Sequence, residues 1–330
     1  MDTNSQGFHE ETSVLSNLPE TEWKLVANTT LLDWKGFWLT PHILKSVISI
    51  ENQFNPLPSD ILLVSFPKTG TTWLKALTAT ILRHNSNPDS DSQTDPLQTQ
   101  NPHELIPFLE LETFGESPSR DINQVPSPRV FNTHLPYSIL PEAVKNSGCR
   151  IIYISRNPAD TFVSTWHFYN KRFGTKIPLE VAFDEFCQGT VGLGPFVDHV
   201  FEYWLEREKE NVLFVTYEEL KDDPNKHVSR IAEFLGCSLS ADDIDQVVWK
   251  CSHERLSELD VNKDEERVHW SGMKFSSYFR RGVVGDGKNL LSPEMMERIE
   301  TLANQRWEGS GLEIKMFGAE PNPVKSLGIN

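Results

Sequence analysis

A lysine, a glycine and several threonines lie together in residues 65–73, which read SFPKTGTTW. An apolar run at residues 61–64 comes before them, and a helical pattern of apolar residues begins at Leu74, so the segment is predicted to be strand, loop and helix. Such a turn aims unpaired backbone N–H groups and the positive end of a helix dipole at one point, where phosphate or sulfate binds. Gly70 lets the backbone approach an anion, and Lys68 adds a point charge.

The order of residues separates this loop from the loop that binds ATP or GTP. That loop reads G-x-x-x-x-G-K-[ST], whereas here Lys68 stands before Gly70 and no other glycine precedes it. The nine residues alone are equally compatible with an ordinary strand-to-helix turn that carries an exposed lysine. The choice between the two interpretations depends on the rest of the chain.

Three more short apolar runs follow, each bounded by turn residues and separated by helical patterns. They lie at residues 130–131, 151–154 and 212–215. Apolar strands that alternate with helices predict a parallel sheet covered on both faces, and such sheets bind ligands beyond the carboxyl ends of their strands. The polar residues that follow the four strands, in chain order, are Lys68, His134, Arg156 and Tyr217. We therefore expect these four side chains to converge at one edge of the sheet.

Composition and charge limit the class of protein. The chain has 330 residues, 31 basic against 47 acidic residues and a net charge of -16, which argues against a nucleic-acid or anionic-membrane partner. Its four cysteines are far apart, and no targeting or membrane-spanning segment is evident, so we expect a cytoplasmic protein. Residues 1–20 are polar and acidic and are predicted to be a mobile tail, and residues 21–330 to be one domain.

The chain resembles the cytosolic sulfotransferases, most closely the plant members that act on flavonoids. The resemblance covers about residues 35 to 310, and these motifs carry it: PKTGTTW at residues 67–73, NTHLP at 132–136, YISRNPAD at 153–160, Ser164, YE at 217–218 and FRRGVVGD at 279–286. It implies a single α/β domain with a central, roughly five-stranded parallel sheet flanked by helices. The implied reaction moves a sulfuryl group from 3′-phosphoadenosine 5′-phosphosulfate to a hydroxyl of a small molecule.

The resemblance also implies which residues bind the donor. Those near the phosphosulfate and the adenine are Lys68, Thr69, Gly70, Thr71, Thr72, Trp73, Tyr217 and His253, and those near the 3′-phosphate are Arg156, Ser164, Arg280, Arg281 and Gly282. A donor with an anion at each end needs two such groups. Arginine forks suit a terminal phosphate, and a lysine point charge suits a leaving oxygen. The alternatives are an ion pair of Arg156 with Asp160 and a solvated pair of arginines at 280 and 281.

His134 is the candidate general base, because a neutral imidazole can accept the proton of an attacking hydroxyl. Lys68 is the candidate electrostatic catalyst, because it can stabilise the charge that develops on the leaving oxygen. By analogy with phosphoryl transfer, sulfuryl transfer is treated as a loose in-line displacement. The transferring group carries less charge than a phosphoryl group, so no metal ion is expected.

Four positions depart from the family pattern: Asn132 replaces the lysine of many animal members, Arg281 replaces Lys, Gly287 replaces Trp and His253 replaces an aromatic residue. The glycine is expected to loosen its segment, and the histidine to weaken contact with the adenine. A nucleotide-dependent small-molecule kinase and a catalytically silent sensor of adenosine bisphosphate remain as alternatives. The acceptor is open among a flavonoid, a steroid, a hydroxyjasmonate, a desulfoglucosinolate and a choline-like alcohol, and no oligomeric state is predicted.

Overall fold

The structure is a computed structural model that describes residues 17–86, 95–269 and 272–315. Its described strands form two sheets. The antiparallel sheet contains β1 (Glu20–Glu22), β2 (Thr30–Trp34) and β3 (Phe37–Leu39). The parallel sheet contains, in spatial order, β5 (Val130–Thr133), β4 (Ile61–Ser65), β6 (Arg150–Ser155) and β7 (Val212–Thr216). The expected α/β class with a parallel sheet is confirmed.

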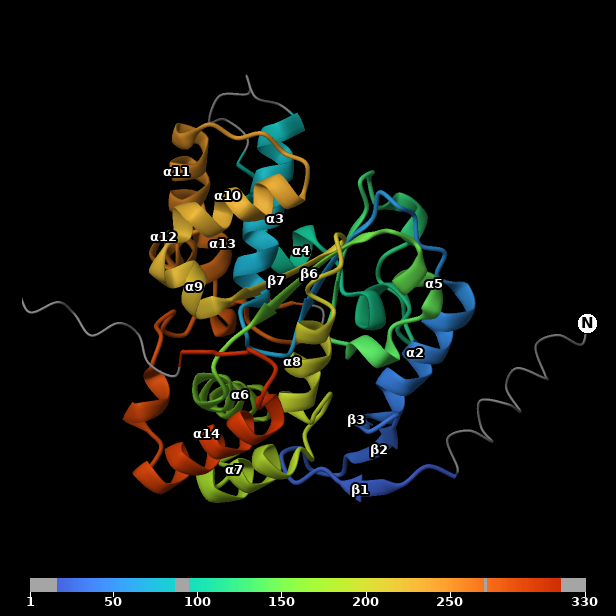
Figure 1. Cartoon of the computed structure of the whole chain (residues 1–330), viewed down its shortest axis with the longest axis vertical. Coiled ribbons are helices and arrows are strands. Elements are labelled where there is room, and N and C mark those ends of the chain that lie inside the picture. The colour runs from blue at the N-terminus through green and yellow to red at the C-terminus, as the bar shows by residue number, and fades with distance from the viewer. Residues whose placement is uncertain (1–16, 87–94, 270–271, 316–330) are drawn as a thin grey trace, which may run out of the picture.

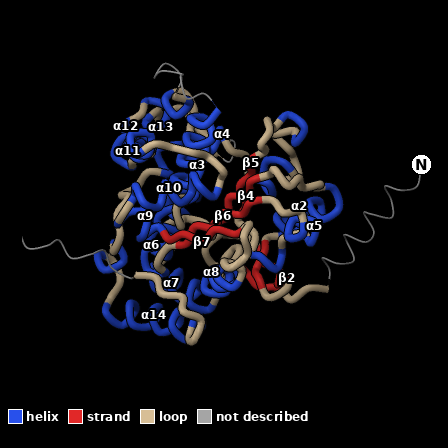
Figure 2. Tube along the Cα trace, turned by 45° about the horizontal axis from the view of Figure 1, so that its top comes forward, coloured by secondary structure: helices blue, strands red, loops and turns tan. Residues whose placement is uncertain are grey.

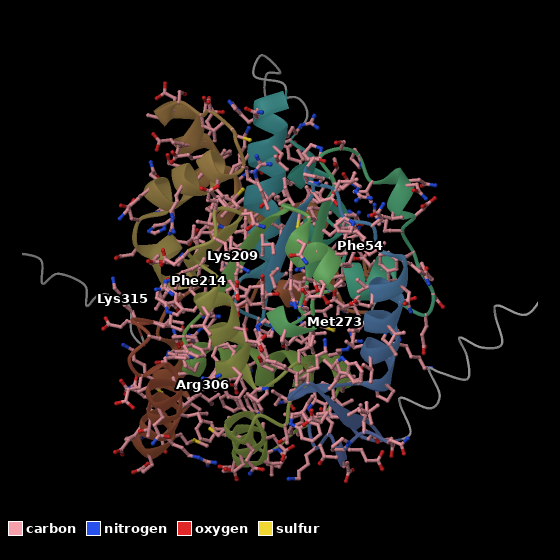
Figure 3. The ribbon with its side chains drawn as sticks, turned by 45° about the vertical axis from the view of Figure 1, so that its right-hand side comes forward. Phe54, Lys209, Phe214, Met273, Arg306 and Lys315 are labelled. Carbon is pink, nitrogen blue, oxygen red and sulfur yellow. The ribbon has the colours of Figure 1, made fainter. Side chains whose placement is uncertain are left out.

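The central residues of the strands of the parallel sheet are mainly apolar because both faces are covered, and polar residues stand mostly at the strand ends. Leu62 and Val64 of β4 pack into one hydrophobic cluster, and Ile61 and Leu63 pack into another on the opposite face. Phe214 of β7, labelled in Figure 3, belongs to the first cluster and lies inside the molecule. Lys315, labelled in the same figure, lies at the edge of the molecule, where the described chain ends.

Helices form a layer on each face of the parallel sheet (Figures 1 and 2). The layer on the second cluster includes α3 (Thr71–Ser86), α10 (Pro224–Phe234) and α11 (Ala241–Lys250). The layer on the first includes α2 (Pro41–Gln53), α6 (Pro158–Phe173), α7 (Leu179–Gln188), α8 (Phe196–Leu205) and α14 (Pro293–Trp307). Shorter helices are α4 (Pro102–Leu105), α5 (Glu142–Asn146), α9 (Tyr217–Asp222), α12 (His253–Glu258) and α13 (Asp260–Lys263). None of the described helices is long and apolar enough to cross a membrane.

The strand order creates a crevice at the carboxyl end of β4. From β4 the chain first crosses to β5 on one side and then returns to β6 on the other side. Helical connections on opposite sides of a strand separate at its carboxyl end, and open parallel sheets bind ligands there. The loop at residues 66–70 lies at this point, and His134 and Arg156 directly follow the two neighbouring strands. The expected convergence of strand ends is therefore built into the topology.

The prediction of roughly five parallel strands is wrong by one strand within the described residues. Beyond β5 the chain makes a single parallel bridge, between Phe108 and Asn132, instead of a fifth strand. The N–H of Phe108 donates to Oε2 of Glu112 (2.8 Å), and a π-helical turn, Leu109–Thr113, begins at the next residue. The ladder stops because the chain turns and because its N–H groups are bonded within that turn.

The predicted N-terminal tail, residues 1–20, lies mostly outside the described residues. Its last residue, Glu20, is the first residue of β1 and pairs with Leu32 of β2. The antiparallel sheet packs its buried Leu31, Leu32 and Phe37 into the first cluster, beside Trp23. The aromatic bulk that follows the tail in the sequence is thus part of the core of the chain.

Candidate active site

Residues 66–70 form the loop between β4 and α3 that the sequence predicts to bind an anion. Gly70 has a φ of +124°, and a Cβ atom at this position would lie 2.7 Å from Cδ1 of Ile154, so both conformation and space require glycine. Lys68 also has a positive φ, 74°, which is strained for a residue with a side chain. The loop continues directly into the first turn of α3, whose leading N–H groups have no acceptor within the helix.

The side chain of Thr69 bonds to the protein backbone and does not face the cavity. Its hydroxyl lies 2.8 Å from the carbonyl of Phe66 and 2.9 Å from that of Ile154, and its N–H donates to the carbonyl of Phe66. Thr69 is fully buried and does not line the cavity described below. Its side chain ties the loop to β6. The prediction that Thr69 contacts the donor stays a prediction, and such a contact would have to come from its backbone.

Lys68 is half-buried and lies against aromatic rings. Its Nζ is 4.1 Å from the centroid of the Phe168 ring and 5.7 Å from that of Tyr278. Burial lowers the pKa of Lys68 to about 7, and the charges of Arg280 and Arg156 act in the same direction. Three cationic side chains therefore repel one another around one space, and an anion bound there relieves that repulsion.

His134 is held as a neutral imidazole with a defined tautomer. Its Nδ1 lies 2.6 Å from the carbonyl oxygen of Ser65, which can only accept, so Nδ1 carries the proton. The lone pair is then on Nε2, and none of the described residues donates a hydrogen bond to that atom. Burial lowers the pKa of His134 to about 3, against the bond to Ser65, which raises it, so the ring is uncharged at physiological pH.

Buried polar groups fix the backbone of His134 from two sides. Its N–H donates to Oε1 of Glu110 (2.8 Å). Its carbonyl lies 2.9 Å from Nε2 of His199, whose Nδ1 is 3.0 Å from the hydroxyl of Tyr153. Because the carbonyl can only accept, His199 donates through Nε2 and accepts from the tyrosine through Nδ1. The candidate base therefore rests on a buried chain that runs from β6 through α8.

Arg156 makes the ion pair that the sequence offered as an alternative, and it lines the cavity as well. Its Nη2 donates to Oδ2 of Asp160 (3.1 Å) and to the carbonyl of Val283 (2.8 Å), and its guanidinium lies 4.6 Å from the centroid of the Tyr217 ring. Its Nε is buried without a partner among the described residues. An oriented arginine with an unused buried donor fits a phosphate ligand.

Asp160 joins the C-terminal arginine segment to α6. Its carboxylate accepts from the N–H groups of Gly285 and Gly287, both at 2.8 Å. In the same segment, Asp286 pairs with Arg280 (2.6 Å) and with Arg281. The two arginines are therefore paired to one buried carboxylate, and the side chain of Arg280 is 28% exposed whereas that of Arg281 is 56% exposed.

The expectation that Gly287 loosens this segment is not supported by its packing. Gly287 is buried, its N–H is bonded to Asp160, and a Cβ atom there would lie 2.8 Å from the Cβ of Ala159. No larger side chain fits without movement of α6. The glycine lets the segment approach the helix closely.

Rings enclose the region expected for adenine. Trp73 packs edge-on against Tyr217, with ring centroids 5.3 Å apart. The His253 ring lies over Gly282, where a Cβ atom would come within 2.4 Å of its Cγ, and Gly282 has a φ of +64°. Nε2 of His253 is buried without a partner among the described residues, and burial lowers the pKa of this histidine.

One cavity of about 570 Å³ brings these groups together, a size typical of small-molecule sites. Apart from Thr69, every predicted site residue lines it: Lys68, Gly70, Thr71, Thr72, Trp73, His134, Arg156, Ser164, Tyr217, His253, Arg280, Arg281 and Gly282. Among the described residues no group of His, Cys, Asp or Glu side chains is arranged to hold a metal ion.

The cavity also has walls that the sequence analysis missed. These lining residues are mainly aromatic or apolar and include His103, Phe108, Leu111, Phe168, Tyr169 and Tyr278. Phe168 carried a signal, because it follows Ser164 by four residues on α6 and so shares its face. Leu111 lies in the π-helical turn that Phe108 precedes, and Tyr278 ends a 3-10 turn, Phe275–Tyr278. Such single turns are too short for a periodicity that marks the face that points inward.

Comparison with known proteins gives a consistent family. Residues 58–311 match the model of the sulfotransferase domain. Cytosolic sulfotransferase 12 of Arabidopsis thaliana is 42% identical over 310 residues, which cover 92% of this chain and 94% of that protein. Cytosolic sulfotransferase 5 of the same plant is 39% identical over 326 residues, which cover 95% of this chain and 99% of that protein.

Solved structures share the fold. A crystal structure of a candidate steroid sulphotransferase of Arabidopsis thaliana has a TM-score of 0.75 and 37% identity, and the match covers 94% of this chain and 97% of that one. A mouse sulfotransferase crystallised with PAP has a TM-score of 0.67 and 27% identity, with 85% of this chain and 95% of that one covered.

Proposed function

Because this chain belongs to the sulfotransferase family, we propose that it transfers the sulfuryl group of 3′-phosphoadenosine 5′-phosphosulfate to the hydroxyl of a small aromatic molecule. The observation that carries the proposal is one cavity in which a neutral histidine, with its Nε2 lone pair unused, lies among Lys68, Arg156 and Arg280 and beside aromatic walls. The names of the relatives support a cytoplasmic location. We retain residues 21–330 as the proposed domain.

Two groups of cations support the identity of the donor. The first is Lys68 with the start of α3, and the second is Arg156 with Arg280 and Arg281. A nucleotide with a phosphosulfate at one end and a ribose phosphate at the other matches this division. The unused Nε of Arg156 supports a phosphate at that end, and the mouse relative binds PAP, the product of such a donor.

In the proposed reaction Nε2 of His134 accepts the proton of the acceptor hydroxyl. The oxygen then forms a bond to sulfur while the bond from sulfur to the phosphate oxygen breaks, and the departing phosphate keeps the electron pair. Lys68 stabilises the charge on that oxygen when it carries its own proton. Burial keeps His134 uncharged and so ready to accept a proton at neutral pH.

The apolar walls support an aromatic acceptor. Phe108, Phe168, Tyr169 and Tyr278 offer ring faces in the cavity that His134 lines, and Leu111 adds an aliphatic surface. A planar phenol of the plant flavonoid class packs against such rings while its hydroxyl reaches the histidine. Ring faces also attract a quaternary ammonium, but Lys68 already lies over the Phe168 ring and repels the cation of a choline-like alcohol.

The test is turnover of donor labelled in the sulfuryl group with a panel of flavonoids, other phenols, steroids and aliphatic alcohols. We expect label on phenols, in excess chelator and without ATP. Turnover of ATP that requires magnesium supports the kinase alternative. Binding of adenosine 3′,5′-bisphosphate without transfer to any acceptor in a plant metabolite extract supports the silent sensor.

A further inference from the structure

A buried lysine and a buried histidine lie directly behind the anion loop. Lys75 of α3 is 0% exposed and His103 of α4 is 3% exposed. A lysine is seldom fully buried without compensation, because removing an ammonium group from water is costly. Its presence in a helix that otherwise packs on the apolar second cluster therefore calls for a specific role.

Every proton of the Lys75 ammonium has an acceptor. Nζ lies 2.8 Å from the carbonyl of Ile106, 3.3 Å from Nδ1 of His103 and 3.7 Å from the centroid of the Phe108 ring. An ammonium can only donate, so Nδ1 of His103 must accept. The lysine thereby selects one tautomer of the histidine.

That tautomer determines the next hydrogen bond. Burial and the nearby charge of Lys75 lower the pKa of His103 well below its usual range, so the ring is neutral and carries one proton. With Nδ1 accepting, the proton is on Nε2, which lies 2.9 Å from Oγ1 of Thr72. His103 therefore donates and Thr72 accepts, which leaves the hydroxyl proton of Thr72 for another acceptor.

We propose that Lys75 and His103 are positioning residues, which act through Thr72 to direct its hydroxyl proton into the cavity toward the anionic 5′ end of the donor. Thr72 lines the cavity in the first turn of α3, next to the N–H groups that the anion loop presents. The inference rests on the proposed function, because it needs an anionic donor at this loop. It adds a hydrogen bond from the Thr72 hydroxyl to the donor, and Lys75 and His103 determine the direction of that bond.

The surroundings of His103 protect this chain of bonds from water. The Phe108 ring lies nearly parallel to the imidazole, at 12°, with centroids 5.7 Å apart, and the centroid of Tyr278 is 4.1 Å away. His103 is 3% exposed, so few waters can replace a lost partner even though His103 and Thr72 border the cavity. Removal of the imidazole should therefore change the orientation of the Thr72 hydroxyl.

The direction of the chain depends on the charge of Lys75. Burial lowers the pKa of Lys75 to about 7; Glu112 and Glu110 of the π-helical turn oppose this effect and Arg120 reinforces it. His103 is the titratable side chain in direct contact with Nζ. Above this pH a neutral amine can accept from Nδ1, which lets Thr72 donate to His103 and turns its lone pairs toward the ligand. The experiment is therefore done at about pH 6, where the ammonium form prevails.

The experiment is a double-mutant cycle on the full chain, with affinity for adenosine 3′,5′-bisphosphate measured by calorimetry. Thr72→Val and His103→Met are each expected to weaken binding about tenfold, the scale of a hydrogen bond to a charged group. The double variant should bind within about twofold of either single variant, because both remove the same interaction. Thr80→Val, in the same helix with its hydroxyl bonded to Ala76, is the control and should bind normally.

Conservative variants separate positioning from structural support. Thr72→Ser keeps the hydroxyl, and His103→Gln keeps an N–H in place of Nε2, so both should bind within about threefold of the unchanged protein. Lys75→Met should weaken binding in the Thr72 background and have little effect in the Thr72→Val background. These comparisons hold even where His103→Met lowers the melting temperature, because they do not need that variant.

Two results overturn the inference. One is normal affinity in Thr72→Val, and the other is fully additive losses in the cycle, which assign His103 a structural role alone. Failure of the unchanged protein to bind the bisphosphate instead contradicts the proposed function. The two failures are therefore distinguishable.

Discussion

The proposed donor end of the cavity and its proposed acceptor end differ in the side chains that form them. At the donor end, charged side chains follow strand ends and are held by buried carboxylates, as Arg156 is by Asp160 and Arg280 by Asp286. At the acceptor end the walls are rings and aliphatic groups from short helical turns and their flanks, such as Phe108, Leu111 and Tyr278. Directional charge recognises one kind of ligand, whereas apolar area accepts many of similar shape. The structure therefore supports the type of reaction more strongly than the identity of the acceptor.

The boundary between the two ends is His134, and its removal should have the largest effect. His134→Asn keeps an N–H that can donate to the carbonyl of Ser65 but has no basic nitrogen. We expect kcat to fall by about 10²- to 10⁴-fold, because the acceptor proton loses its base. Affinity for adenosine 3′,5′-bisphosphate should be unchanged, as calorimetry can check. Turnover within threefold of normal contradicts the role.

The second prediction concerns whether Arg156 binds the 3′-phosphate of the donor. Arg156→Ala should weaken binding of the 3′,5′-bisphosphate by about 1.5 to 3 kcal/mol, or roughly ten- to 150-fold. Binding of a nucleotide without the 3′-phosphate should hardly change in the same variant. Equal losses for both nucleotides place Arg156 in general support of the fold, together with its bond to Val283.

The pKa of Lys68 predicts a pH dependence that belongs to the donor end alone. Its folded pKa is lowered to about 7, so in the free protein the cation is present below this pH and is lost as pH rises. We expect kcat/KM for the donor to fall toward tenfold per pH unit above about pH 7. At saturating donor kcat should be flatter, because the bound anion raises the pKa of the lysine.

His134 should add no acid limb to this profile near neutrality. Its pKa is lowered to about 3, so the ring stays uncharged, and able to accept a proton, down to pH values far below its usual range. Lys68→Arg is the control, because arginine keeps its charge; it should reduce the fall above neutral pH to the part that comes from Lys75, whose pKa is also lowered to about 7. A loss of kcat centred near pH 6.5 instead assigns His134 an ordinary, solvated pKa.

Leu111 tests the acceptor end by itself. Leu111→Ala removes apolar contact area, so KM for a preferred phenol should rise about fivefold, which corresponds to about 1 kcal/mol. The rank order of acceptors should change, and donor KM should remain the same. A change in donor KM instead contradicts the division of the cavity into two ends.

The smallest expected effect concerns His253. Here the donor end, like the acceptor end, is expected to bind its ligand through contact with a ring. His253→Phe removes a buried Nε2 that has no partner among the described residues and adds ring area for stacking. We expect the 3′,5′-bisphosphate to bind about 0.5 to 1.5 kcal/mol more tightly, with acceptor KM unaltered. Weaker binding in calorimetry instead indicates that the imidazole hydrogen-bonds to the ligand or that a phenyl ring crowds Gly282.

Local pattern in the sequence determined the skeleton of the donor end. The apolar runs become β4, β5, β6 and β7, and the residues that follow them line one cavity because parallel strands end at the same edge. The turn at Gly70 and the helix that begins after Asn157 follow from conformational preferences of single residues. These preferences involve only a few neighbouring residues, so they can be predicted from a single sequence.

Tertiary structure alone decided which side chains support the site. Thr69 turns to the carbonyl of Ile154, 85 residues away, and Asp160 holds Gly287, 127 residues away. Lys75 contacts His103 because α3 packs on α4, and the walls at Phe108 and Tyr278 depend on where two short helical turns pack. No periodicity encodes such contacts, because they arise from the packing of elements that are distant in sequence.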